Sequence, residues 1–404
     1  MPDLARGTRL KITTLLAGSI FLSGAAFAAM TPYRAIVGVE TLGLSNAMFG
    51  LVMGLNGIAG ALIAVIFGWL SDRVEDRRVL LLLAAILGAV GLGLVWWLRS
   101  PLAFVAAFCL LVPFGNATFS QSFAYARAIL DRDRPGKAQL TLSYLRTTFT
   151  LAWIVMPPVA GWIAAGTTAY GAFGLGAAAQ IGCVLFVALL WSRADAKIGF
   201  SKKGQDGTAA VRQTARIDVS YRWGIVGVTL GLIALQLNMV VLPLVILQDL
   251  GGSLADVGIN SAIAAAIEVP AMIAWGYVAL RLCKEVALAI ACAIFAVYFG
   301  LVAVATSVEQ VMLLQGIAAV AIAAILSINI SYLQDAIKGR VGLSTSLVDI
   351  SRVAAVLIAS GIFALNVGEH FAPLFVIAAA SSAVAASLLL FAGRLSKMNG
   401  ETGL

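Results

Sequence analysis

The chain has 404 residues, of which 61% are hydrophobic and only 11% are charged. Soluble domains are about 45–50% apolar and about 25% charged, so this composition excludes an ordinary water-soluble fold. The net charge is +8. A basic balance of this size is compatible with binding to an anionic partner, so the positions of the basic residues decide what it means.

Long apolar segments follow one another along the chain, six on each side of one polar stretch. About 20 consecutive apolar residues cross the hydrocarbon core of a bilayer as a helix. The predicted spans are residues 12–36, 45–70, 79–98, 102–128, 139–163, 170–191, 223–247, 255–280, 286–305, 309–333, 342–366 and 372–393. The sequence therefore predicts an all-α membrane protein with twelve transmembrane helices in two pseudo-symmetric halves. These are an N-terminal six-helix bundle over residues 1–192, a cytoplasmic linker over 193–222 and a C-terminal six-helix bundle over 223–404.

The lysines and arginines predict the orientation of these helices. With the N-terminus in the cytoplasm, all but four of the 27 basic residues lie in cytoplasmic segments. The exceptions are Arg34 and Arg99 at the outer side and Arg146 and Arg352 within spans. This bias follows the positive-inside rule and predicts a multi-pass protein of the bacterial inner membrane with both termini in the cytoplasm. Anionic lipid is then a sufficient partner for the positive charge, and no nucleic acid is needed.

The two halves resemble each other in sequence. A glycine, a basic residue, a leucine, a hydroxyl residue, a serine and a charged residue recur in the same order in two segments. The segments are 136–146, which enters the fifth span, and 339–349, which enters the eleventh. The second and eighth spans likewise end in Gly68-Trp69 and Gly276-Tyr277. The repeat is therefore six helices long.

The short loop after the second span contains acidic and basic residues at a distinctive spacing. These residues are Gly68, Asp72, Arg73, Asp76, Arg77 and Arg78. The spacing resembles the signature loop of the major facilitator superfamily, with Glu75 in place of the usual second glycine. We expect Asp72 to face the positive end of a neighbouring helix and Asp76 to cap the third helix, with Arg77 and Arg78 in the headgroup region. The alternative is a charged turn that only obeys the positive-inside rule.

Short matches spread over nearly the whole chain carry a narrower resemblance. They include Ser71-Asp72, Asp76-Arg77-Arg78, Gln121, Phe123-Ala124, Ala126-Arg127, Arg146, Leu151-Ala152-Trp153, Pro157-Pro158, Glu268-Val269-Pro270-Ala271-Met272, Gln334-Asp335, Gly339-Arg340, Asn56 and Asn238. In this order they resemble the bacterial sugar efflux transporter family within the major facilitator superfamily. The resemblance implies proton-driven export of lactose and related glycosides, with a substrate site near the midplane between parallel six-helix halves.

Ionisable residues inside predicted spans are candidates for the chemistry of transport. A charge at the membrane centre costs at least about 2.5–3.5 kcal/mol, so such residues are rarely kept without a role. Glu268 lies halfway along the eighth span, and Asp349 lies in the eleventh, so both are candidates for proton coupling. Asp349 and Arg352 are three residues apart on one helix face and are also expected to neutralise each other. Arg146 has no acid on its own helix, and snorkelling to the inner surface is its alternative.

The candidates for substrate binding are polar side chains on the helices that line the cavity in this superfamily, the first, fourth, seventh and tenth, together with residues of the fifth and eleventh spans. The set comprises Asn116, Gln121, Tyr125, Arg146, Trp153, Gln236, Asn238, Asn329, Tyr332 and Arg352. Neutral amides and hydroxyls suit the hydroxyl groups of a sugar, and an aromatic face suits its ring. The alternative for each residue is an ordinary hydrogen bond between helices, worth about 0.6–2 kcal/mol.

Three functions of different classes remain open. The first is proton-coupled efflux of sugars or small glycosides by alternating access. The second is a multidrug/proton antiporter of the same superfamily, and the remote third is a membrane receptor or enzyme. No metal-ligand cluster, nucleotide-binding loop or nucleophile constellation is found, so we expect no enzyme activity, cofactor or metal. The expected partners are a small-molecule substrate, protons and the bilayer, with the protein as a monomer.

Overall fold

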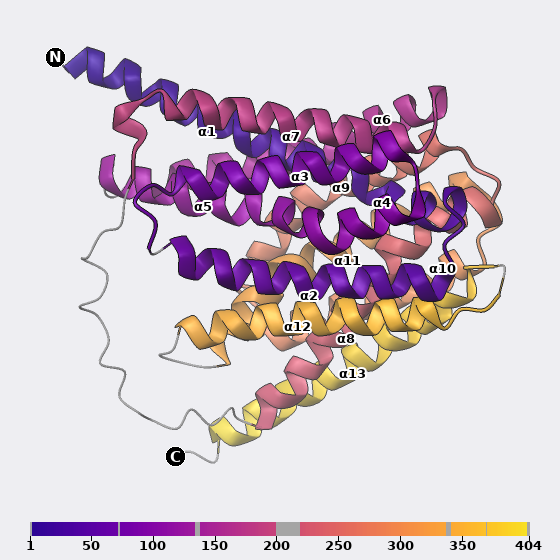
Figure 1. The fold of residues 1–404 in the computed structure, drawn as a ribbon. Coiled ribbons are helices and arrows are strands. Elements are labelled where there is room, and N and C mark those ends of the chain that lie inside the picture. Colours follow the sequence, from indigo (N-terminus) through magenta and orange to yellow (C-terminus); the bar gives the residue numbers. More distant parts are fainter. Residues whose placement is uncertain are drawn as a thin grey trace. The chain divides into compact units, whose positions relative to one another are not determined.

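The computed structural model describes residues 2–71, 73–133, 138–198, 219–336, 341–368 and 370–401 (Figure 1). The regular structure of these residues is entirely helical. Twelve helices or helix combinations are long and apolar enough to cross a membrane. Most of these helices begin and end within a few residues of the predicted spans. The predicted fold class is therefore confirmed.

The described residues form two compact units. The first contains residues 2–43, 55–71, 73–133 and 138–198, and the second contains 44–54 and the described residues from 219 onward. The elements up to the linker are α1 (Pro2–Met30), η1 (Thr31–Tyr33), η2 (Ile36–Thr41), α2 (Asn46–Ser71), α3 (Arg78–Leu98), α4 (Pro101–Ala106), η3 (Ala107–Leu111), α5 (Val112–Asp133), α6 (Ala138–Gly166), α7 (Tyr170–Trp191) and η4 (Ala194–Ala196). Those after it are α8 (Val219–Leu244), η6 (Val245–Asp249), α9 (Leu254–Val278), α10 (Lys284–Ala303), α11 (Val308–Asp335), α12 (Val341–Ala364) and α13 (Pro373–Glu401).

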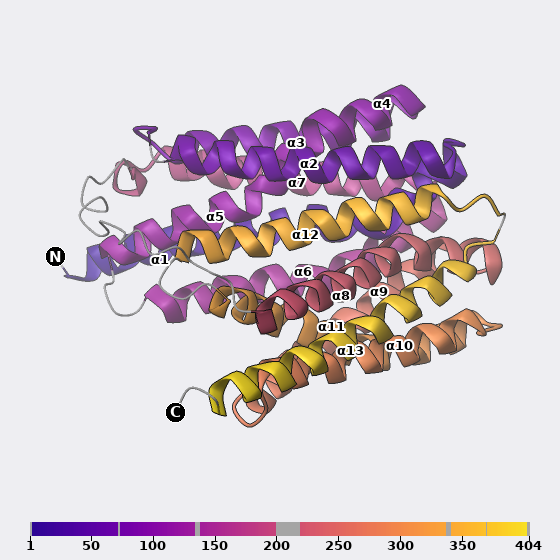
Figure 2. The ribbon, with the colours of Figure 1, turned by 90° about the horizontal axis from the view of Figure 1, so that it is seen from below.

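Each unit buries small and aromatic side chains between neighbouring helices. In the first unit α3 packs against α5 and α7, and α1 packs against α6 and α7 (Figure 1). In the second unit α13 packs against α8 and α10, while α11 packs against α9 and α10 (Figure 2). The start of α2 belongs to the second unit, where Asn46 Nδ2 donates to the carbonyl oxygen of Asn366 at 2.8 Å.

The internal repeat is also visible in the backbone. The first and seventh spans both end in a π-helical turn, closed by Leu42 N–H on the Val37 carbonyl and by Leu250 N–H on the Val245 carbonyl, each at 2.9 Å. The next residues, Gly43 and Gly251, have positive φ angles of 66° and 65°. Glycine adopts this conformation without the steric cost that a Cβ would bring. Each glycine is followed two residues later by a serine, at the same spacing in both halves, whose hydroxyl accepts a backbone N–H of the next helix.

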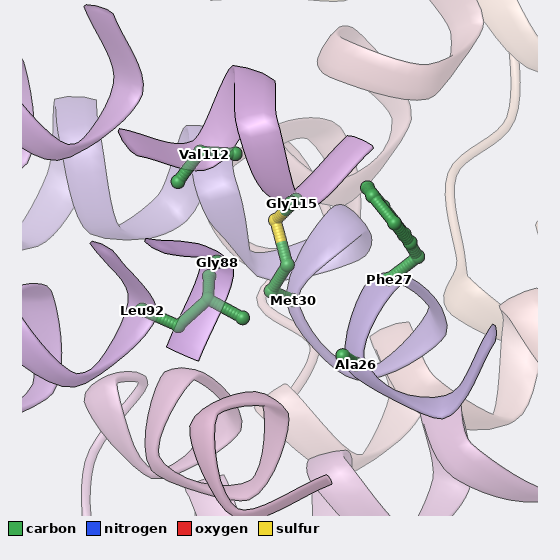
Figure 3. Close-up of a pocket in the computed structure, with 7 residues that line it drawn as sticks. All are labelled: Ala26, Phe27, Met30, Gly88, Leu92, Val112 and Gly115. Carbon is green, nitrogen blue, oxygen red and sulfur yellow. The ribbon is translucent and has the colours of Figure 1, made fainter. Parts of the chain in front are cut away.

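Glycines let three helices of the first unit approach closely. A Cβ at Gly88 of α3 would lie 2.8 Å from the Cα of Gly115 and 2.6 Å from Gln180 Nε2. Beside this crossing is a small hollow lined by Ala26, Phe27, Met30, Gly88, Leu92, Val112 and Gly115 (Figure 3). Every side chain of this lining is apolar, so the hollow offers no hydrogen bond to a polar ligand and is best described as a packing defect.

The close crossing at Gly88 gives a stability prediction. Gly88→Ala forces a methyl group against Gly115 and Gln180, and overpacking of this kind costs about 1–3 kcal/mol. Gly93→Ala on the same helix is the matched control because nothing lies within 4 Å of a Cβ there. Thermal unfolding of the two purified variants in detergent should show a lower midpoint for Gly88→Ala only. Equal midpoints would mean that α3 shifts freely at the crossing.

Candidate functional site

The loop between α2 and α3 is described except for Asp72, whose expected role stays a prediction. The Arg73 guanidinium lies over the Trp69 ring, 3.6 Å from its centroid. Asp76 Oδ1 accepts the backbone N–H of Arg78, the first residue of α3, at 3.0 Å. Asp76 therefore satisfies one of the free N–H groups at the start of this helix, as expected from the sequence.

Arg78 was expected in the headgroup region, and the structure buries its side chain within the protein. The residue is only 4% exposed. Its Nε donates to both Asp76 carboxylate oxygens, and its NH1 donates to the carbonyl oxygens of Leu190 at 2.8 Å and Arg193 at 3.1 Å. The last carbonyls of a helix have no partner within the helix and carry partial negative charge, which a buried guanidinium neutralises. Arg78 thus joins the loop to the end of α7.

The candidates on α5 and α6 have different surroundings. Tyr125 is 1% exposed, and its hydroxyl donates to the carbonyl oxygen of Ala196 at 2.7 Å. Asn116 is half-buried, and its Oδ1 has no hydrogen-bond partner among the described residues. Gln121 is buried, Trp153 is half-buried, and Arg146 is exposed with its guanidinium 5.9 Å from the Phe123 ring centroid. The structure therefore engages Tyr125 in a backbone contact and leaves the Asn116 amide oxygen available.

In the second unit a buried tyrosine joins two of the polar residues. Gln315 Nε2 of α11 donates to the Tyr298 hydroxyl of α10 at 3.1 Å, and that hydroxyl donates to Asn238 Oδ1 of α8 at 3.2 Å. Exposed fractions are 1%, 0% and 5%, in that order. The chain of hydrogen bonds links three helices. Gln236 is half-buried and, two residues before Asn238, points in a different direction because an α-helix turns by about 200° over two residues.

Asn329 and Tyr332 are buried one helical turn apart on α11. Asn329 Oδ1 and the Tyr332 hydroxyl have no partner among the described residues. The Tyr332 ring packs on Tyr221, with 5.4 Å between centroids. Gly224 makes room for the hydroxyl, since a Cβ there would overlap it. Whether these two residues bind substrate stays a prediction.

The candidate acids lie on different helices of the second unit. Glu268 is half-buried in α9, two residues before Pro270, and no hydrogen bond or ion pair joins it to another described residue. Asp349 and Arg352 of α12 are both exposed, and within the described residues they form no ion pair, contrary to expectation. Residues three apart lie on one face of a helix, but their side chains meet only when their rotamers point toward each other. Their proposed roles in transport stay predictions.

Two residues of interest were missed from the sequence. Tyr298 lies in an apolar run, so the sequence predicts an ordinary core residue there. Its hydroxyl group was the one signal that could have indicated its hydrogen bonds to amide side chains of other helices. Arg34 was assigned to the outer side without a further role, and it follows the first candidate span, Ile12–Tyr33, just before η2. Arg34 is half-buried, and its Nε has no partner among the described residues. A buried donor without a partner is costly, so Arg34 is a candidate for function.

Two further observations concern the segment before α13 and the expectation about metals. The His370 side chain is 80% exposed, and its Nδ1 lies 3.3 Å from Asp249 Oδ1. Asp249 Oδ2 also accepts the N–H groups of Phe371 and Ala372, just before α13. In the described part of the chain no three His, Cys, Asp or Glu residues gather into a metal site.

The hydrogen bonds of the Tyr298 hydroxyl predict that removing this group alone lowers the stability of the protein, although the ring stays in place. Tyr298→Phe leaves a buried amide oxygen on Asn238 and a buried N–H on Gln315 without this partner, and each such group costs about 1–3 kcal/mol. Tyr277→Phe on α9 is the matched control because Tyr277 is 70% exposed. Thermal unfolding in detergent should show a clear decrease for Tyr298→Phe alone. No decrease would mean that water replaces the hydroxyl.

Similarity to known proteins covers almost the whole chain. It is 26% identical to a putative sugar efflux transporter of Deinococcus radiodurans, over 94% of this chain and 97% of that protein. It is 28% identical to sugar efflux transporter C of Escherichia coli, over 84% of this chain and 85% of that protein. Among solved structures, a variant of the nucleoside transporter NupG has the same fold, with a TM-score of 0.78 at 14% identity, covering 94% of this chain and 99% of that one.

The sequence model of the Major Facilitator Superfamily matches residues 15–236, more than half of the chain. Its relatives are named as transporters and not as enzymes. The helical architecture agrees with this assignment. The chain is therefore a multi-pass membrane transporter that belongs to the Major Facilitator Superfamily.

Proposed function

We propose that the protein exports sugars or small glycosides across the bacterial inner membrane in exchange for protons, by alternating access, with both termini in the cytoplasm. Relatives named as sugar efflux transporters match it over most of its length. The observation that carries the proposal is the composition of the polar groups within the spans. They are mostly neutral amides and hydroxyls, accompanied by one half-buried carboxyl without a described partner, Glu268.

Neutral amides are suited to a substrate with many hydroxyl groups. A sugar hydroxyl both donates and accepts, and an amide offers one acceptor and two donors without a countercharge. Asn116 and Asn329 each retain an amide oxygen without a partner among the described residues. Such buried acceptors are costly while empty, so a hydroxyl that donates to them gains the full hydrogen bond. These uncharged acceptors therefore favour a polar, uncharged substrate.

Glu268 is suited to carrying the coupling proton. A carboxyl surrounded by low dielectric favours its neutral form, and access to water restores its charge. Pro270 lies inside α9 and removes one hydrogen bond of that helix, which loosens the backbone beside the acid. Glu268 thus combines partial burial, no described ion pair and a local weakness of the helix.

The same acid also favours one alternative. An unpaired carboxyl within a span attracts lipophilic cations, so a multidrug/proton antiporter is the second candidate function. Counterflow in proteoliposomes distinguishes the two. We expect labelled lactose or a small alkyl glycoside to exchange with saturation, and unlabelled sugar to compete. Saturable exchange of ethidium-like cations, with no exchange of any sugar in the panel, would favour the alternative.

Replacing the acid separates coupling from substrate movement. Glu268→Gln imitates the protonated state permanently, so proton-driven accumulation in inverted vesicles should decrease to the level of empty vesicles. Sugar exchange without a gradient needs no net proton movement and should remain within about twofold of the wild type. Asp349→Asn, measured in the same preparation, is the comparison. Intact accumulation in Glu268→Gln with loss in Asp349→Asn would transfer the role to Asp349, and intact accumulation in both would contradict the buried-acid proposal.

A further inference from the structure

The first residues of the predicted linker are docked on the first unit. Residues 193–198, which we call the strap, follow α7 and contain the short helix η4. Ala196 is fully buried, and it belongs to the same hydrophobic cluster as Leu81, Ala126 and Leu190. Ile198 packs against that cluster. Apolar side chains of the strap are therefore part of the core of this unit.

Every backbone carbonyl of the strap accepts a hydrogen bond. Arg78 NH1 donates to Arg193, Arg132 NH2 to Asp195 at 2.6 Å, and Arg132 NH1 to Lys197 at 3.1 Å. The Tyr125 hydroxyl donates to Ala196 at 2.7 Å, and the Arg77 N–H donates to Ile198 at 3.2 Å. The Ala194 carbonyl accepts the N–H of Lys197 within the strap. A segment that only tethers two bodies has its carbonyls hydrated, so this complete pairing indicates a fixed position.

The donors outside the strap come from α5, from the loop that precedes α3 and from Arg78, the first residue of α3. Arg77 and Arg78 belong to the loop with the superfamily spacing, and Arg78 is held in turn by Asp76 at 2.6 Å. The ion pair is nearly buried, with side chains 5% and 12% exposed. Separating the two charges would leave each of them poorly hydrated, so breaking the pair is unfavourable. The loop and the strap therefore share two direct contacts, one through a side chain and one through the backbone.

The internal repeat supplies a natural comparison for Tyr125. Ser100 and Ser307 cap the helices of the fourth and tenth spans by accepting the N–H of Ala103 and Gln310. Tyr125 and Tyr332 follow these serines at equal spacing, so they are equivalent in the two halves. Tyr125 is bonded to the strap, whereas the Tyr332 hydroxyl is buried and has no partner among the described residues.

We propose that the strap stays docked on the first unit and fixes the loop between α2 and α3, so that loop, strap and unit move as one body. The part of the predicted linker up to Ile198 then belongs to the first unit. The segment recognised by Arg78, Tyr125 and Arg132 is the chain's own backbone after α7. This proposal concerns the cytoplasmic end of the first unit and does not depend on which substrate is carried.

Hydrogen exchange of the full-length protein in nanodiscs tests the proposal without a transport assay. Peptides covering 193–198 and 73–79 should both exchange slowly in the wild type, at the bonded N–H groups of Ala196, Lys197, Arg77 and Arg78. Tyr125→Phe removes one bond to the strap, and the lost hydroxyl makes no hydrogen bond to the described residues of the loop. It should accelerate exchange in both peptides by about tenfold, the equivalent of one hydrogen bond. Arg78→Lys, which loses the forked contact, should accelerate both at least as much.

Tyr332→Phe is the matched control, and it should leave both peptides unchanged. Faster exchange in the strap alone after Tyr125→Phe would show that the loop is held independently and would overturn the coupling. Rapid exchange of Ala196 and Lys197 in the wild type would show that the strap is not docked. Thermal unfolding of each variant separates these local effects from a general loss of stability.

Discussion

A lipid bilayer offers no hydrogen bonds to a polypeptide, and the structure of this transporter depends on that constraint. Each backbone N–H and C=O within the hydrocarbon must be satisfied by the protein, which is why the spans are helical from end to end. Most free groups lie at helix termini, where side chains or tight turns supply partners, and others lie where a proline interrupts a helix, as Pro270 does in α9. Arg78 at the end of α7, and the π-helical turns that close the first and seventh spans, are such solutions.

The same constraint divides the polar side chains into two groups. Asn238, Tyr298 and Gln315 satisfy one another across three helices, so they stabilise the second unit at little cost. Asn116, Asn329 and Tyr332 each keep a buried polar atom without a partner among the described residues. Groups of the second kind lower the stability of the empty protein. A substrate or water that bonds to them recovers this free energy, so they are better candidates for transport than equally polar residues already engaged.

Much of the fold follows from the sequence because the length of an apolar run is a local property. The spans were predicted within a few residues in most cases, and the repeat was recognised from motifs at the ends of helices. The strap was not predicted, since its position depends on contacts with distant segments. The π-helical turns were not predicted either, although the hydrogen bonds that close them are local. Arg78 is the clearest example: its sequence context is a charged loop, but its guanidinium is buried because α7 ends beside it.

The candidate site was less predictable for the same reason. Sequence spacing placed Asp349 and Arg352 on one helix face, but both remain exposed and form no ion pair in the described part of the chain. Tyr125 and Tyr332 looked alike as polar aromatic residues, and only the fold shows that one hydroxyl binds the strap. The sequence identifies which residues have side chains that could bind a substrate or carry a proton. Tertiary contacts decide which of them are already engaged.

The most direct test of the account is whether sugar movement alone drives protons. Proteoliposomes that enclose a pH-sensitive dye and a concentrated sugar substrate are diluted into sugar-free buffer at the same pH. Proton-coupled exchange predicts that the pH inside these vesicles changes as sugar leaves, that dissipating the proton gradient abolishes the change, and that Glu268→Gln shows none. Rapid loss of labelled sugar with no change in internal pH would contradict proton coupling and indicate a facilitated carrier.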